Sequence, residues 1–172
     1  VLFVGDLVSA DEVGDWWTFL DLGRELFASA PVLAATGNHD IGYYSDPEDS
    51  WFGRYFPHPT SSAEGHVHRV DLRDAAFLTL DSEETSGFGE GGDQRAWVDG
   101  ELAAIAGAGE PDWVFAQWHI PAYDVGTRTS STSQEQLRGL TAPFEGAVDW
   151  VFTGHEHLAQ RMLPLRHDGV VA

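Results

Sequence analysis

The feature that most constrains this chain is a set of four short apolar runs, each of which ends at a polar or histidine residue. A length of four to six residues suits buried strands better than helices. Between the runs lie longer segments whose apolar residues recur every three or four positions, the spacing of a helix with one buried face. This alternation predicts an α/β fold with strands buried on both faces. The runs are Val1–Val4, Pro31–Thr36, Trp113–Trp118 and Val148–Thr153.

The intervening segments predict helices and one hairpin. Asp11 to Ala30 carries an apolar stripe and stops at Pro31, so we expect one helix with Asp11 as its N-cap. A shorter helix can begin at Asp46-Pro47. The other expected elements are a hairpin of Val67–Leu72 and Ala75–Leu80 around Arg73-Asp74, and helices over Asp93–Ala106 and Ser133–Leu140.

Composition narrows the class of protein. A length of 172 residues suits a single domain, here residues 1–172, with a real core. Nine arginines, no lysine and 28 acidic residues give a net charge of −19, which excludes nucleic-acid binding through a basic face. The chain has no cysteine, so it forms no disulfide or zinc–thiolate site. No apolar stretch approaches the roughly 18 residues of a membrane span.

The two ends of the sequence resemble cut points. Val1–Val4 begins abruptly as a strand without an initiator methionine, and residues 167–172 turn and enter what resembles a further strand. We therefore expect this sequence to be part of a longer chain, truncated at both ends.

Five potential metal ligands directly follow the apolar runs: Asp6, Asn38, His119, His155 and His157. Taken singly, each has a plainer interpretation, as a turn residue, a helix cap or a core histidine. Together they require four coincidences in one order, and loops at the carboxyl ends of strands converge on one crevice. A nitrogen and oxygen ligand set suits Mn, Fe, Zn, Ni or Co. A carboxylate shared among histidines suggests two cations, about 3.5–4 Å apart, clamping a phosphate.

These motifs resemble the calcineurin-like metallophosphoesterase family, nearest its purple acid phosphatase branch. The resemblance covers nearly the whole chain and implies a two-sheet sandwich flanked by helices, a four-layer αββα fold. It also implies metal-dependent hydrolysis of a phosphate ester by activated hydroxide. The motifs that carry it are Gly5-Asp6, Gly37-Asn38-His39-Asp40, His119 and Gly154-His155-Glu156-His157.

The resemblance assigns the metal ligands residue by residue. Asp6 would bridge two metals, most simply Mn, Fe or Zn. Asn38, His119 and His155 would complete one metal position, and His157 would bind the other.

The resemblance also assigns two catalytic residues. His39 would lie near the leaving group, where it protonates the leaving oxygen or stabilises the phosphoryl charge. Asp40 would hold the His39 ring.

Two departures from the family pattern change the expectations. The family has an Asp-x-His motif on an upstream strand that this sequence does not contain, so the second metal position retains only Asp6 and His157. We therefore expect one tight metal per 172-residue chain, with little activity. Purple acid phosphatases carry a tyrosine ligand where this chain has Ser9, so we expect no purple enzyme.

Other polar residues are weaker candidates for metal or substrate binding. His66 and His68 are expected on the surface of the hairpin rather than as ligands. Arg128 fits a solvated loop better than a phosphate contact, although both interpretations stand. The remaining candidates are loop or pocket-rim residues: His58, Tyr43 and Tyr44.

The alternative function is a non-catalytic domain that keeps a partial metal site for stability or binding. His39 favours the enzyme, because no metal needs it as a ligand. An Asp-x-His motif upstream would support the enzyme, and its absence would support the alternative. The resemblance slightly favours a secreted or extracytoplasmic location and leaves the substrate open between monoester and diester.

Overall fold

The computed structural model describes residues 1–41, 50–57, 66–83, 87–89, 91–166 and 168–171. Strands and helices alternate along most of the chain, as the sequence predicts. The strands are β1 (Leu2–Val4), β2 (Leu33–Ala35), β3 (His68–Leu72), β4 (Ala75–Thr79), β5 (Trp113–Gln117) and β6 (Trp150–Phe152). The helices are α1 (Val13–Leu22), α2 (Arg24–Ser29), α3 (Trp51–Tyr55), α4 (Asp93–Ala108) and α5 (Ser131–Thr141), followed by the 3₁₀ turn η2 (Ala142–Phe144).

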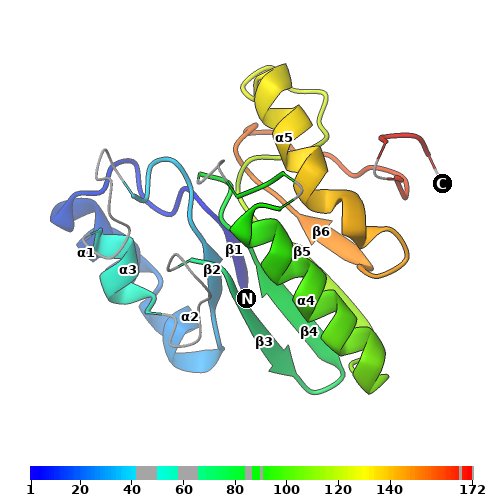
Figure 1. Cartoon of the computed structure of the whole chain (residues 1–172). Coiled ribbons are helices and arrows are strands. Elements are labelled where there is room, and N and C mark those ends of the chain that lie inside the picture. The colour runs from blue at the N-terminus through cyan, green and yellow to red at the C-terminus, as the bar shows by residue number, and fades with distance from the viewer. Residues whose placement is uncertain (42–49, 58–65, 84–86, 90, 167, 172) are drawn as a thin grey trace.

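The strands form two sheets. β1 and β2 pair in parallel, with Leu2 opposite Leu33. The second sheet has the order β3-β4-β5-β6, in which β3 is antiparallel to β4 and the other pairs are parallel. Helices α1, α2 and α3 lie beside the two-stranded sheet, and α4 and α5 lie beside the four-stranded sheet (Figure 1). This arrangement confirms the predicted two-sheet α/β architecture flanked by helices.

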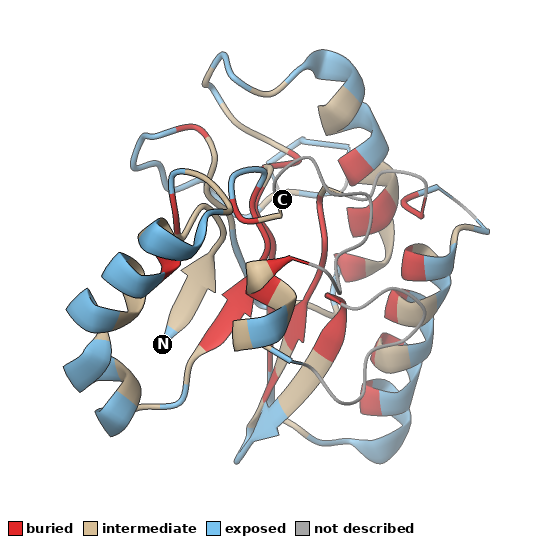
Figure 2. Cartoon of the chain, turned by 90° about the vertical axis from the view of Figure 1, so that its left-hand side faces the viewer, coloured by how far each residue is buried: buried red, intermediate tan, exposed pale blue. Residues whose placement is uncertain are grey.

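Each sheet packs its own apolar core against its helices. Between the four-stranded sheet and α4, the buried core includes Leu78, Val98 and Val114. Beside β2, Trp16 of α1 and Phe52 of α3 are both fully buried. The buried positions of α4 face the sheet, while its outer side is exposed (Figure 2). These two cores fix the strands, and the strand ends then position the loops that carry the polar motifs.

The segment predicted as one helix from Asp11 to Ala30 is two helices. α1 ends at Leu22 and α2 begins at Arg24, with Gly23 between them at φ −84° and ψ −1°. No helix in the described part of the chain has the length and apolar character needed to cross a membrane.

Asp11 does not cap α1. The residue before the helix is Glu12, which makes no side-chain cap. Asp11 Oδ1 instead accepts hydrogen bonds from Trp16 Nε1 at 2.8 Å and from the Trp51 amide at 3.2 Å. The carboxylate therefore joins α1 to α3.

The other elements lie close to their predicted bounds. α3 is capped by Ser50, whose hydroxyl accepts a hydrogen bond from the Gly53 amide. The predicted helix start at Asp46 lies outside the described residues. The same is true of the loop or pocket-rim candidates His58, Tyr43 and Tyr44. At the end of the chain, Leu165 and Val171 form an isolated antiparallel bridge instead of the predicted strand.

The prediction that His66 and His68 lie on the surface is wrong, since their exposed fractions are 3% and 2%. The His66 ring packs edge-on against Phe52, and its Nδ1 lies 3.3 Å from Asp81 Oδ2. Asp81 follows β4, and its Oδ1 accepts from the Thr36 hydroxyl that follows β2, at 3.1 Å. The hairpin therefore begins inside the molecule, where this buried network joins the two sheets.

We predict that Asp81→Ala lowers the free energy of unfolding by about 3 kcal/mol, because several buried polar groups lose their acceptor together. The same change at Asp71, whose side chain is 50% exposed and pairs with Arg69, should cost less than about 1 kcal/mol. Urea denaturation of both variants measures the difference. Equal losses would show that the Asp81 network does not hold the two sheets together.

Candidate metal centre

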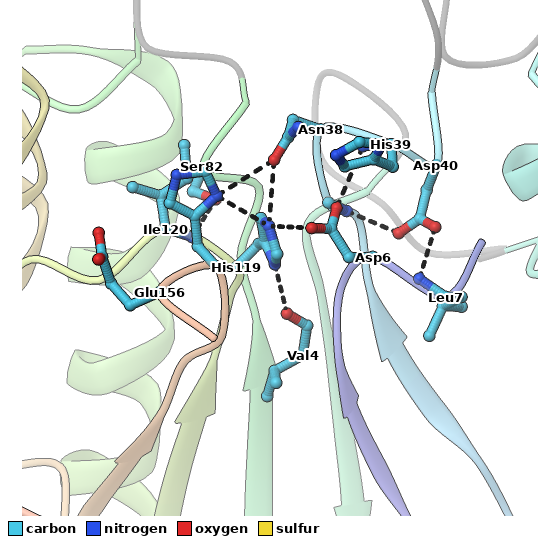
Figure 3. Close-up of polar contacts among 12 residues, drawn as sticks. Val4, Asp6, Leu7, Asn38, His39, Asp40, Ser82, His119, Ile120 and Glu156 are labelled. Carbon is cyan, nitrogen blue, oxygen red and sulfur yellow. Dashed lines mark hydrogen bonds and ion pairs between the residues drawn. The ribbon is translucent and has the colours of Figure 1, made fainter. Parts of the chain in front are cut away.

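The carboxyl ends of four parallel strands meet at one edge of the sandwich. Asp6 follows β1, Asn38 follows β2, His119 follows β5 and His155 follows β6. The two sheets thus contribute two residues each to one cluster (Figure 3). The structure brings together four of the five ligands that the sequence predicts.

The four donor atoms lie close together. His119 Nε2 is 3.2 Å from Asp6 Oδ2 and 3.2 Å from Asn38 Oδ1. His155 Nδ1 is 3.1 Å from Asn38 Oδ1 and 3.2 Å from His119 Nε2. Ligand atoms that share one ion at about 2.1 Å are about 3.0–3.4 Å apart, so the cluster has the dimensions of a metal site.

The tautomer of His119 decides what the cluster can hold. Its Nδ1 lies 2.8 Å from the Val4 carbonyl oxygen, which can only accept a hydrogen bond, so Nδ1 carries the proton. In the neutral ring Nε2 is then a lone pair that faces the oxygens of Asp6 and Asn38. Acceptor atoms at this distance repel one another unless a proton or a metal ion lies between them. The donor set therefore fits a cation bound by nitrogen and oxygen.

The pKa values of Asp6 and His119 are shifted in the directions that favour an ion pair between them. Burial acts to raise the pKa of Asp6, but the hydrogen bond and charge of His119 outweigh it and lower that pKa. Burial acts to lower the pKa of His119, but its bonds to Asp6 and the Val4 carbonyl raise it. Burial and the charge of His119 lower the pKa of His155. The shifts of Asp6 and His119 thus favour the charged form of each, and the two opposite charges attract one another.

The backbone around the cluster holds unfavourable conformations. Asp6 and His155 have φ values of 54° and 66°, in the left-handed region that costs about 1–2 kcal/mol for a residue with a side chain. Gly37 lies so close that a Cβ there would overlap the Asp6 backbone. Strain of this kind collects at functional sites, where the surrounding structure enforces it.

Asp40 helps to hold the backbone near the cluster in these conformations. It is fully buried; Oδ1 accepts from the Leu7 and Val8 amides at 2.7 and 3.2 Å, and Oδ2 accepts from the Gly37 amide at 2.8 Å. Burial raises the pKa of Asp40 to about 6, against the three amide bonds, which favour its ionised form. Asp40 therefore clamps the loop after β1 to the loop after β2 (Figure 3).

The His39 ring contacts the Ser9 carbonyl oxygen instead of the expected partner, Asp40. His39 Nδ1 lies 2.8 Å from the Ser9 carbonyl oxygen, and the His39 amide donates to Asp6 Oδ1 at 3.1 Å. The Asp40 oxygens are directed at backbone amides, as described above. The backbone of Ser9, rather than Asp40, therefore orients the exposed His39 ring.

His157 lies outside the group formed by Asp6, His119 and His155, and its side chain is exposed. Its assignment to a second metal position stays a prediction. The side chain of Arg128 is exposed as well.

Glu83, in the loop after β4, is not among the residues that the motifs predict. Burial raises the pKa of this carboxyl to about 7, with the charges of Asp81 and Asp6 acting in the same direction and that of His119 opposing them. No motif marks Glu83; its closeness to His119 follows from the pairing of β4 with β5, which spacing alone does not reveal.

Comparison with known proteins decides the family. A family model described as calcineurin-like phosphoesterase matches residues 1–159. The chain belongs to the calcineurin-like phosphoesterase family. The family carries out metal-dependent hydrolysis of phosphate esters, which agrees with the resemblance drawn from the motifs.

Curated relatives include purple acid phosphatase 22 of Arabidopsis thaliana, which is 27% identical over 93% of this chain and 38% of its own length. An uncharacterized protein of Mycobacterium tuberculosis is 26% identical over 96% of this chain and 35% of its own length. The chain thus spans less than two-fifths of the length of these relatives.

Among solved structures, a purple acid phosphatase from yellow lupin (Lupinus luteus) seeds superposes with a TM-score of 0.66. The match is 19% identical and covers 90% of this chain and 30% of the lupin chain. At this identity the likeness establishes the fold, which is that of the phosphoesterase family.

We predict that Asp6→Asn weakens metal binding by more than about 100-fold, since even residues that only support metal ligands contribute about 10- to 100-fold. The substitution removes the single negative charge among the four donors. Titration of the metal-free protein with Mn²⁺ or Zn²⁺ in a calorimeter measures the affinity.

The matched control for this titration is Asp21→Asn, because the Asp21 side chain is 75% exposed in a pair with Arg24. That variant should bind metal as the wild type does. Unchanged affinity in Asp6→Asn would remove Asp6 from the metal centre.

Proposed function

We propose that this protein is a metal-dependent phosphoesterase that hydrolyses a phosphate ester at the edge where the strand ends meet. The observation that carries the proposal is the convergence of four acceptor atoms, all within about one hydrogen-bond distance of a neighbour. Transition-metal ions bound there would supply a hydroxide nucleophile at neutral pH and offset the negative charge of the phosphate.

Four residues would hold one ion: Asp6, Asn38, His119 and His155. Their nitrogen and oxygen donors suit Mn, Fe or Zn. In the dinuclear form of the proposal Asp6 is shared between two ions and His157 contributes to the second.

His39 is suited to proton transfer rather than metal binding. With Nδ1 held by the Ser9 carbonyl, the ring presents Nε2 on the exposed side of the site. Its amide is bonded to Asp6, so the ring is tied to the centre through the backbone. His39 would therefore stabilise the phosphoryl charge or donate the proton that the leaving alcohol takes up.

The charge of the chain supports binding of phosphate with the help of metal ions rather than through a basic surface. With a net charge of −19, the protein as a whole repels anions, and bound cations reverse the sign of charge locally. The purple acid phosphatase relatives favour a phosphate ester as the substrate.

We predict that His39→Ala lowers kcat by about 10²–10⁴-fold, the usual contribution of a general acid–base group. Metal content should stay unchanged, because the contact with Asp6 is made by the backbone amide, which alanine keeps. The test measures turnover of an aryl phosphate together with elemental metal analysis of the Mn²⁺-loaded protein.

His119→Ala is the comparison variant, and it should lose metal and activity together. If His39→Ala loses metal as well, its role is structural. If His39→Ala keeps full turnover, the assignment of His39 to the chemistry is wrong.

A further inference from the structure

Glu156 lies between the two histidines of the Gly154-His155-Glu156-His157 motif but turns its carboxylate away from the cluster (Figure 3). Both of its oxygens bind the loop between β5 and α5. Oε2 accepts from the amides of Thr127 and Arg128 at 2.9 and 3.0 Å, and Oε1 accepts from the amide and hydroxyl of Thr129 at 2.6 and 2.8 Å. Four hydrogen bonds thus join the metal-ligand loop to this second loop.

The hydrogen bonds to Glu156 favour the ionised form of its carboxylate. Glu156 is only 7% exposed; burial acts to raise its pKa, but the bonds from residues 127–129 lower the pKa to about 2. Successive backbone amides directed at one point form an anion-binding concavity, and here the anion belongs to the protein itself. Gly126 completes the fit, because a Cβ there would overlap the Glu156 carboxylate.

The loop that Glu156 holds carries one arginine, Arg128. The Arg128 amide donates to Glu156, the residue directly after the ligand candidate His155, at 3.0 Å, so the loop is tied at this point to the metal-ligand loop. The guanidinium is exposed and has no hydrogen-bond or ion-pair partner among the residues that the structure describes. Glu156 cannot neutralise it cheaply, because its oxygens are already committed to the loop amides.

We infer that Arg128 binds the phosphoryl group of the substrate and that Glu156 is a positioning residue that holds Arg128 beside the metal centre. The inference rests on the proposed phosphoesterase function and adds a specificity element to it. A guanidinium donates two parallel hydrogen bonds to adjacent phosphate oxygens. A monoester leaves three oxygens unesterified and carries up to two negative charges, so Arg128 favours monoesters over diesters.

The test measures the affinity of the Mn²⁺-loaded protein for inorganic phosphate by calorimetry, with metal content recorded for each variant. Arg128→Gln should weaken phosphate binding by about 10- to 100-fold, the range expected for hydrogen bonds between charged groups. Arg128→Lys should restore part of the loss. The matched control is Arg73→Gln, which makes the same charge change in the exposed turn between β3 and β4 and should bind phosphate as the wild type does.

Glu156→Gln tests the positioning role. It should weaken phosphate binding while metal content stays the same, and exchange of the amide hydrogens of residues 127–129 should become faster. If Glu156 acts through Arg128, adding Glu156→Gln to Arg128→Gln should weaken binding little further. Additive losses, or loss of metal in Glu156→Gln, would show that Glu156 supports the fold or the ligand loop instead.

The outcomes separate this inference from the proposed function. Phosphate binding by the wild type with unchanged affinity in Arg128→Gln overturns the role of Arg128 and leaves the phosphoesterase proposal standing. A metal-loaded wild type that binds no phosphate overturns both.

Discussion

The mutual repulsion of acceptor atoms at the ends of the strands is the constraint on which the site depends. In its neutral form His119 presents a lone pair at Nε2, because its Nδ1 proton is donated to the Val4 carbonyl. That lone pair faces the oxygens of Asp6 and Asn38 at 3.2 Å. Such an arrangement is stable only with a positive charge at its centre, and the folded chain must hold it against its own repulsion.

Three buried carboxylates provide that support, each by binding polar groups from a different loop. Asp40 joins the loops after β1 and β2, Asp81 joins the two sheets through Thr36, and Glu156 joins the ligand loop to residues 127–129. In each case the carboxylate is almost completely buried. Part of the acidic excess of the chain is therefore structural, because these charges face inward to backbone amides or hydroxyls.

Much of the architecture could be predicted from the sequence because the apolar runs and helical stripes are strong local signals. The strands, the hairpin, α4 and α5 all lie close to their predicted bounds. The break at Gly23 was missed, since the apolar spacing continues across it from Val13 to Phe27. The burial of His66 was missed because its partner, Asp81, follows β4, a strand whose place in the sheet is set by tertiary packing.

In the candidate site, too, some features follow from local sequence signals and others depend on tertiary packing. Four of the five predicted ligands converge, because the carboxyl ends of parallel strands meet whatever the details of the loops. The roles of Asp40, Ser9 and Glu156 depend on where individual backbone amides and carbonyls point, and sequence motifs carry no such information. The place of Glu83 depends on the pairing of β4 with β5, which the spacing of residues along the chain does not reveal.

A crystal structure of the protein with Mn²⁺ or Zn²⁺, with the ion located from its anomalous scattering, tests the central claim most directly. We predict an ion bound at about 2.0–2.3 Å to His119 Nε2, His155 Nδ1, Asn38 Oδ1 and a carboxylate oxygen of Asp6. An ion held elsewhere, with His119 Nε2 still directed at Asp6 and no metal between them, would contradict it.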